Sequence, residues 1–488
     1  MDLRKGSMGR DNFVERHGLW TDDNIEAAAG VAREVDKNNI EVIRLSFADQ
    51  HGILRGKTIM ADGLGAAMRN GCALTTTLLV KDTSHRTVTT AFTKDGGIGL
   101  EEMSGAGDFL MVPDPNTFRV LPWAPDTGWL LSDIYFPNGK PVPFSTRQVY
   151  RNALQILTGE GYDFVAGLEI EFHLLKLEDR KLSPRDATQP ATPPDVSLLT
   201  HGFQYLTENR MDEIDPVLQI LRRDLLDLGL PLRSMEVEYG PSQVELTFHP
   251  GVGMEPADNM VLFRGAVKQI CRRHGYHASF MCRPGLPNLF SSGWHLHQSL
   301  RAHDGGGNAF MATEDGAVMS PLAENYAAGL LEHAAAASVF TTPTINGYKR
   351  FQPYSLAPDR AIWGHDDRGV MIRAIGGKND PGTRLENRAG DPAANPYLYM
   401  ASQILCGLDG MERKLPLGPP AEEAYEADGP KMPRTLWDAM EALRENAMFR
   451  DKLGDRFVDY ILTLKGSEVS RFLSEVTDWE QREYFSLF

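Results

Sequence analysis

Two glutamates alternate with apolar residues at one point of the sequence. Glu169 and Glu171 stand between Leu168, Ile170 and Phe172. In a β-strand, residues two apart project from the same face, with Cα atoms roughly 6.6 Å apart. Partly desolvated carboxylates at this spacing raise each other's pKa unless cations lie between them. The pattern therefore indicates a cation-binding strand, although an ordinary solvated strand face shows the same alternation.

A second strand-like segment carries two imidazoles. His295 and His297 alternate with Trp294 and Leu296, so both histidines are expected on one face. Imidazole nitrogens and carboxylate oxygens are common ligands of divalent cations. The alternative is a hydrogen-bonded histidine pair within the core.

Further acids lie in two other segments. Glu238 and Glu245 stand on either side of a Gly-Pro break at residues 240–241, which by itself is typical of a turn between solvated strands. Glu386 stands between Arg384 and Arg388, as in an ion-pair ladder. Because similar alternation recurs in separate segments, the sequence favours one shared site for Mg²⁺ or Mn²⁺.

Arginines in the C-terminal half add donors that suit phosphate or carboxylate groups. A guanidinium group offers bidentate hydrogen bonds, and a phosphoryl-transfer site requires such charge neutralisation. The arginines concerned are Arg350, Arg368, Arg373, Arg384 and Arg388.

The elements that position these residues begin with a small N-terminal unit. Thr21 is expected to cap a helix, and alternation over 41–47 followed by a turn at 49–52 predicts a β-hairpin. Residues 52–58 are one residue short of a phosphate-binding P-loop and lie in this hairpin, so we do not expect them to bind nucleotide. Short strand-like runs over 53–135 complete the unit.

The remainder is expected to form one large α+β domain. The domains are thus predicted at 1–140 and 141–488. Residues 178–200 and 305–307 are expected to be surface loops. Long amphipathic helices are expected at 145–160, 213–228, 258–274 and 321–337.

Composition narrows the class of protein. The 488 residues carry a formal net charge of −16, which opposes binding to nucleic acid. Four scattered cysteines indicate neither a zinc site nor a disulfide framework. No apolar run of signal or membrane-spanning length is present, so we expect a cytoplasmic protein without a membrane partner.

In combination, these segments resemble the glutamine synthetase superfamily, and most closely its glutamate-amine ligases. The matching segments 168–172, 238–245, 293–300, 346–350, 384–388 and 391–396 occur in the family's order. The resemblance implies a small β-grasp-like N-terminal domain that closes the neighbouring subunit's site. It also implies a catalytic domain with a curved antiparallel sheet and flanking helices, assembled as a hexameric ring or a double-ring dodecamer.

The resemblance also implies roles for individual residues. Glu171, Glu238 and Glu245 would hold one cation, and Glu169, His295 and Glu386 a second, with two or three Mg²⁺ or Mn²⁺ ions per site. The expected ATP-binding residues are His297, Ser299, Arg373 and Arg384. The expected catalytic residues are Arg350, Arg368 and Glu238. The expected substrate-binding residues are Arg350, Arg388, Glu171, Tyr205 and Leu356.

Three departures from the family pattern concern the substrates, two of them the nitrogen substrate. The family's acidic Asp-Gly-Ser-Ser stretch is absent between Lys81 and Gly99, and Leu356 replaces a glutamate that stabilises ammonium. Phe290 and Ser291 stand where the family often has Asn-Gly, which bears on glutamate recognition. An apolar wall favours an amine that carries hydrocarbon.

The implied activity is ATP-dependent formation of a γ-glutamylamide from glutamate and an apolar alkyl or aromatic amine, through γ-glutamyl phosphate. An ammonia-using glutamine synthetase is the first alternative. A catalytically silent structural or regulatory homologue and a phosphotransferase of related fold are the others.

Overall fold

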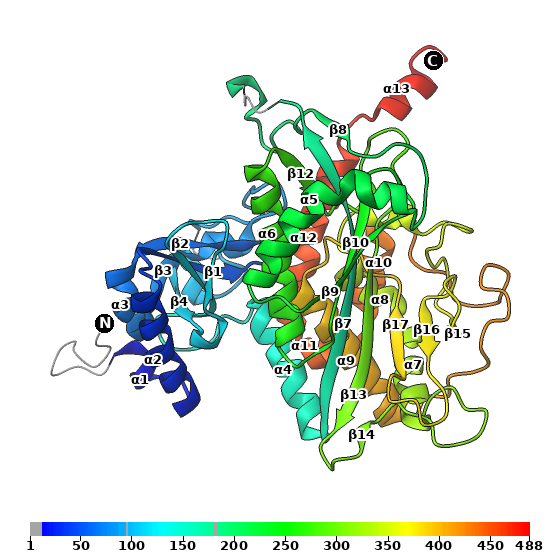
Figure 1. Cartoon of the computed structure of the whole chain (residues 1–488), viewed down its shortest axis with the longest axis horizontal. Coiled ribbons are helices and arrows are strands. Elements are labelled where there is room, and N and C mark those ends of the chain that lie inside the picture. The colour runs from blue at the N-terminus through cyan, green and yellow to red at the C-terminus, as the bar shows by residue number, and fades with distance from the viewer. Residues whose placement is uncertain (1–11, 94–95, 180–182) are drawn as a thin grey trace.

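The computed structural model describes residues 12–93, 96–179 and 183–488 (Figure 1). Its N-terminal part is a twisted sheet in the order β2-β1-β6-β4-β3, with β5 paired to β6. Strands β1 and β2 form the predicted hairpin, and β1 also pairs in parallel with β6. The elements are α1 (Phe13–Arg16), α2 (Asp22–Lys37), β1 (Val42–Ala48), β2 (Leu54–Met60), α3 (Leu64–Asn70), β3 (Cys72–Thr75), β4 (Asp108–Pro113), β5 (Arg119–Val120) and β6 (Thr127–Tyr135).

The C-terminal part is built on a larger sheet in the order β15-β16-β17-β13-β7-β10-β9. It is antiparallel except where β15 meets β16; β8, β11 and β12 also pair with β7, and β14 pairs with β13. Its strands are β7 (Tyr162–Leu177), β8 (Val196–Leu198), β9 (Leu232–Val237), β10 (Gln243–Phe248), β11 (Gly251–Val252), β12 (Tyr276–Ser279), β13 (Trp294–Ala302), β14 (Gly307–Asn308), β15 (Trp363–His365), β16 (Ile372–Ile375) and β17 (Arg384–Asn387). The α+β architecture predicted from the sequence is therefore confirmed.

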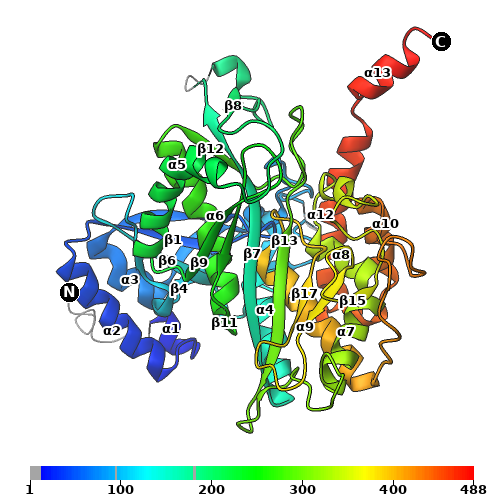
Figure 2. The same cartoon turned by 45° about the vertical axis from the view of Figure 1, so that its right-hand side comes forward.

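Helices pack against this sheet (Figure 2). Both α4 and α6 contact β7, and both also contact α9. The helices are α4 (Thr146–Gly159), α5 (Glu208–Asp227), α6 (Glu255–Arg273), α7 (Pro321–Glu332), α8 (Ala334–Thr341), α9 (Pro396–Arg413), α10 (Leu436–Glu445), α11 (Ala447–Leu453), α12 (Asp455–Leu473) and α13 (Asp478–Tyr484). Among the described residues, no helix has the length and apolar character needed to cross a lipid bilayer.

The long strand β7 shows the alternation predicted from its sequence. Leu168, Ile170 and Phe172 are buried, while Glu169 and Glu171 are only partly buried. Removing three such apolar side chains from water contributes about 1.5–3 kcal/mol each, which fixes which face of the strand meets the core. A shift of one residue would bury the two glutamates instead, so hydrophobic burial also fixes the orientation of the acids.

The β1–β2 turn docks onto the C-terminal part. Asn395 caps α9 by accepting a hydrogen bond from the Tyr397 amide, and its amide group donates to the Asp49 carbonyl at 3.1 Å. Arg264 donates to the Gly52 carbonyl at 2.7 Å. Gly52 has a φ of +70°, and a Cβ there would lie 2.7 Å from the Arg264 guanidinium, so only glycine fits. The residues that resemble a P-loop thus form part of the packed β1–β2 turn and the beginning of β2.

Expectations about one long helix and one surface loop were wrong. The helix expected over 321–337 divides into α7 and α8 at His333, whose ring bonds Asp409 and Asn446 at 2.7 and 3.0 Å. The expected loop over 178–200 contains β8, which pairs with the end of β7. Residues 180–182 of this segment lie outside the described residues.

The boundary at residue 140 falls between β6, which ends at Tyr135, and α4, which begins at Thr146. One buried hydrophobic cluster nevertheless continues from Ile43 in β1 to Tyr460 in α12. The division into domains 1–140 and 141–488 therefore stays a prediction.

Candidate active site

The register of the large sheet places the predicted cation ligands next to one another. Strands β10, β7, β13 and β17 are neighbours, and the acids and histidines on them face their counterparts across the strands. The directly opposed pairs are Glu245 with Glu171, His295 with Glu169, and His297 with Glu386.

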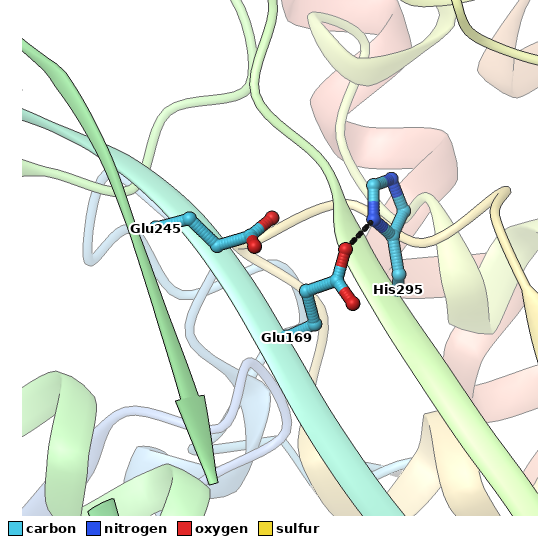
Figure 3. Close-up of side chains that lie close together, drawn as sticks. All are labelled: Glu169, Glu245 and His295. Atoms are coloured by element: carbon cyan, nitrogen blue, oxygen red, sulfur yellow. Dashed lines mark hydrogen bonds and ion pairs between the residues drawn. The ribbon is translucent and has the colours of Figure 1, made fainter. Parts of the chain in front are cut away.

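Glu169 is the centre of this cluster. One of its carboxylate oxygens lies 2.8 Å from His295 Nδ1, and the other lies 2.9 Å from His297 Nε2. Figure 3 shows the first contact, with Glu245 directed toward Glu169 from the neighbouring strand. Burial opposes ionisation of Glu169, but the hydrogen bonds with both imidazoles hold its pKa well below the usual range. Glu169 is thus a carboxylate at neutral pH.

Glu245 is a buried acid that has no cation opposite it. Its side chain is nearly inaccessible, at 5% exposure, and within the described chain it has neither a hydrogen-bond nor an ion-pair partner. Burial, together with the charges of Glu169 and Glu171, raises the pKa of Glu245 to about 11. A divalent ion would remove this penalty, because it would supply the missing positive charge.

Glu238 extends the acidic cluster from the end of β9. Burial and the charge of Glu171 raise the pKa of Glu238 to about 8, against one hydrogen bond from the Tyr239 amide at 3.1 Å. Glu171 itself accepts hydrogen bonds from the Gly293 amide at 2.8 Å and the Gln243 side chain at 3.3 Å. These bonds fix the direction of the Glu171 carboxylate.

Glu386 lies at the other side of Glu169. It is fully buried between Arg373, whose Nη1 donates at 3.0 Å, and Arg388, which pairs with its other oxygen. Burial alone would raise the pKa of Glu386, but Arg388 and the nearby His295 lower it to about 2. Glu386 is therefore ionised and held rigidly.

The described residues contain two groups whose ligand atoms all lie within 4.8 Å of one another. They are Glu169, Glu245 and His295, and Glu169, His297 and Glu386. Of the predicted cation ligands, these groups contain Glu169, Glu245, His295 and Glu386, and they add His297. Glu171 and Glu238 belong to neither group, although a Glu171 oxygen lies 3.8 Å from His295 Nε2. Carboxylate oxygens and imidazole nitrogens are a donor set that fits Mn²⁺ or Mg²⁺.

A cavity of about 460 Å³ opens beside Glu169 and His297. Arg384 Nε donates to His297 Nδ1 at 3.2 Å, which connects the wall of the cavity to the cluster. Arg233, which sequence reasoning missed, also lines it. The lining includes all four predicted nucleotide-binding residues, His297, Ser299, Arg373 and Arg384, and also Arg368.

The two arginines expected to bind the carboxylate substrate contact residues of the cluster, Arg350 at His295 and Arg388 at Glu386. Arg350 is 5% exposed, donates to the Arg388 carbonyl at 2.9 Å, and approaches His295 Nε2 at 3.3 Å. Arg388 donates to the carbonyls of Arg368 at 3.0 Å and Leu356 at 3.4 Å. Leu356 is 57% exposed, so its side chain lies at the surface while its backbone is tied to Arg388.

Tyr205 lies near the acids although it is on a different segment. Burial and the charges of Glu238 and Glu245 raise its pKa, and Arg368 lowers it. Glu236, which sequence reasoning missed, lies directly opposite Glu245 in the β9–β10 register. Its position two residues before Glu238 was the signal that would have predicted it.

Comparison with known proteins agrees with this arrangement. The family model for the catalytic domain of glutamine synthetase matches residues 143–484. The chain belongs to the glutamine synthetase family. This glutamine synthetase family member is 45% identical to the γ-glutamylanilide synthase of an Acinetobacter species, over 98% of this chain and 99% of that protein.

Two other glutamine synthetase relatives match this family member over nearly its whole length. The γ-glutamylethanolamide synthetase of Streptomyces coelicolor is 31% identical, with 92% of this chain and 94% of that protein covered. The solved structure "Apo GmaS without ligand" has a TM-score of 0.77 at 27% identity and covers 93% of this chain and 99% of that one. The fold is therefore that of the glutamine synthetase family.

Proposed function

We propose that this protein is an ATP-dependent ligase that joins the γ-carboxylate of glutamate to an aromatic amine. The observation that carries the proposal is the cluster around Glu169, with its unpaired acid Glu245, beside a cavity lined by arginines. The similarity to a γ-glutamylanilide synthase over almost the full length of both chains supports the same chemistry.

The reaction would proceed in two steps. In the first, a γ-carboxylate oxygen of glutamate attacks the γ-phosphorus of ATP and displaces ADP, which leaves γ-glutamyl phosphate. In the second, the amine nitrogen attacks the acyl carbon, and the carbon–oxygen bond to phosphate breaks. The products are the γ-glutamylamide, ADP, phosphate and one proton.

Phosphoryl transfer depends mainly on positioning and charge neutralisation. Bound Mg²⁺ or Mn²⁺ would screen the phosphate oxygens, with Glu169, Glu171, Glu238, Glu245, His295 and Glu386 as the proposed ligands. Arg373 and Arg384 line the cavity proposed for ATP, and Arg368 lines its wall next to them. The Arg388 guanidinium is held by Glu386 and by the Arg368 carbonyl, so it is already oriented before substrate binds.

The absence of the family's acidic residues near the amine favours an aromatic amine as the substrate. Alkylamines and ammonia are cations at neutral pH, so they need nearby carboxylates for binding and a base for activation. Arylamines are neutral there, because the nitrogen lone pair is delocalised into the ring. The family's glutamate that stabilises ammonium, on the segment called the flap, is replaced by Leu356 in this chain. The carboxylate that only a charged amine requires is therefore absent at this position.

We also propose roles for individual residues and for the assembly of subunits. Arg350 and Arg388 would bind glutamate, and Tyr205 and Leu356 would face the amine. Residues 1–140 would close the site of a neighbouring subunit in a hexameric or dodecameric assembly, in the cytoplasm. Arg350, Arg368 and Glu238 would act directly in catalysis.

Product analysis tests the activity. The purified protein is incubated with glutamate, ATP, Mg²⁺ and one of aniline, ethylamine or ammonia, and the products are identified and quantified by mass spectrometry. γ-Glutamylanilide should form fastest. Faster turnover with ammonia would instead identify an ammonia-using glutamine synthetase, and no amide with any amine would favour a silent homologue.

A further inference from the structure

Three aromatic rings from separate segments meet beside the acidic cluster. The Tyr239 ring lies 5.2 Å from the Phe203 ring and 5.1 Å from the Phe290 ring, measured between centroids. Phe203 precedes α5, Tyr239 follows β9, and Phe290 precedes β13. We refer to these three residues as the aromatic trio.

The trio is not part of the protein core. Phe203 and Tyr239 are 42% and 41% exposed, and none of the three belongs to the buried hydrophobic clusters of the described chain. Two exposed aromatic rings held at a surface cost hydration without stabilising a core. Such an arrangement is typical of a ligand-binding surface.

Backbone contacts connect the trio to the proposed cation ligands. The Tyr239 amide donates to the Glu238 carboxylate at 3.1 Å. Gln243 donates to the Ser291 carbonyl at 3.1 Å and to the Glu171 carboxylate at 3.3 Å, which links the Phe290 segment to the same acids. The rings therefore lie next to the place where the activated glutamate would react.

The shape of the trio depends on glycine and on two hydrogen bonds. A Cβ at Gly240 would lie 2.7 Å from the Phe290 Cβ, so only glycine lets the Tyr239 and Phe290 segments approach this closely. The amides of Gln204 and Leu206 donate to the carbonyls of Tyr239 and Val237, both at 3.2 Å, and these bonds hold Phe203 beside Tyr239.

We infer that the aromatic trio is the subsite that binds the ring of the acceptor arylamine. The inference rests on the proposed ligase function and assigns its amine specificity to Phe203, Tyr239 and Phe290. Tyr239 and Phe290 meet edge to face at 79°, an arrangement that presents both a ring face and a ring edge to a third aromatic group. The amine nitrogen would then point toward the Glu238 end of the trio, where the acyl group is activated.

Substitution by leucine tests the subsite, because leucine keeps the apolar character and removes the ring. In Tyr239→Leu, Phe203→Leu and Phe290→Leu, kcat/KM for aniline should fall about tenfold, while kcat/KM for ammonia stays within about twofold. Tyr239→Phe, which keeps the ring, should retain the wild-type ratio. Phe472→Leu, a substitution at a phenylalanine of equal exposure on α12, serves as the matched control.

Binding of γ-glutamylanilide, measured by calorimetry without ATP, tests the subsite independently of turnover. The leucine variants should bind it about tenfold more weakly than Tyr239→Phe does. Unchanged binding, or equal losses of activity with aniline and ammonia, would overturn the inference. A wild-type protein that binds γ-glutamylanilide through the trio but makes no amide would overturn the proposed function and leave the subsite standing. Because Phe203 and Tyr239 are exposed, their variants remain informative if Phe290→Leu does not fold.

Discussion

Glu169 in β7 and His295 in β13 are direct cross-strand partners, and their side chains meet at 2.8 Å. They are 126 residues apart in the sequence, so only the register of the sheet brings them together. The same Glu169 carboxylate contacts His297 at 2.9 Å. One side chain therefore connects both candidate cation groups, and its loss should disturb both.

Replacing Glu169 tests this central position. Glu169→Gln should weaken Mn²⁺ binding by about 100-fold or more, because an amide carries no charge and offers one oxygen fewer to the cations. Titration calorimetry with Mn²⁺ measures the affinity, and the rate of ADP release measures activity. Glu178→Gln, just beyond the exposed end of the same strand, is the matched control. Equal Mn²⁺ affinity in both variants would place the cations elsewhere.

Removing metal should make the stability of the protein depend on pH in a specific direction. Glu238 and Glu245 have pKa values raised to about 8 and about 11 in the folded protein, above the ordinary value of about 4.3 in the unfolded chain. Their neutral forms stabilise the fold below the unfolded pKa, and this contribution is lost as pH rises through the folded values. Each proton that unfolding releases contributes about 1.4 kcal/mol per pH unit.

Thermal unfolding in EDTA should therefore show a melting temperature that declines between about pH 6 and pH 9. Mg²⁺ or Mn²⁺ should restore it, with a gain that grows as the pH rises, because cations bind the deprotonated acids. Glu245→Gln should flatten the decline in EDTA. A gain from metal that is constant across this range would contradict the raised pKa values.

Arginines of the cavity should determine the affinity for ATP. Arg384→Ala should raise the KM for ATP by about 10- to 100-fold, since a charge-assisted hydrogen bond contributes about 1.5–3 kcal/mol. The substitution also removes the donor to His297. The control on the same sheet is Arg301→Ala. Arg301 lies on β13 and forms an ion pair with Asp163 on β7. A similar rise in the two KM values would show that general charge, rather than this cavity, attracts nucleotide.

The strands of the site could be predicted from sequence, but their partners could not. Alternation at 168–172 and 294–297 has a period of two, so it reveals which residues share a face. Pairing of Glu245 with Glu171, 74 residues away, depends on the long-range register, which local patterns do not encode. The family resemblance supplied the link between these segments that physical reasoning on single segments left open.

Local signals also misplaced the beginning of α5. The helix was expected from residue 213, but it begins at Glu208 and contains Pro216. Pro216 is exposed, so the Asp212 carbonyl that lacks its helical partner faces solvent and the helix tolerates the proline. Glu236 was missed for a different reason, because only the β9–β10 register places it beside Glu245.

Restoring an acid at Leu356 should change which amine is used. The Leu356 carbonyl accepts a hydrogen bond from Arg388, so the backbone at this position is tied to the residue that holds Glu386. In Leu356→Glu, a carboxylate at the flap position would attract ammonium and accept a proton from it. The ratio of kcat/KM for ammonia to that for aniline should rise by about tenfold or more, in line with the usual contribution of general base catalysis.

The matched control is Leu356→Gln, which has nearly the same shape as the glutamate variant but carries no charge. If charge determines amine choice, this variant should lose activity with aniline without gaining any with ammonia. Ammonia turnover is measured at several pH values, because a carboxylate that acts as a base must be ionised. Leu356 has a φ of +58° in the present fold, which costs a glutamate no more than a leucine, so the comparison isolates the effect of charge. An equal gain with ammonia in both variants would show that polarity at the flap, rather than an anion, determines the choice of amine.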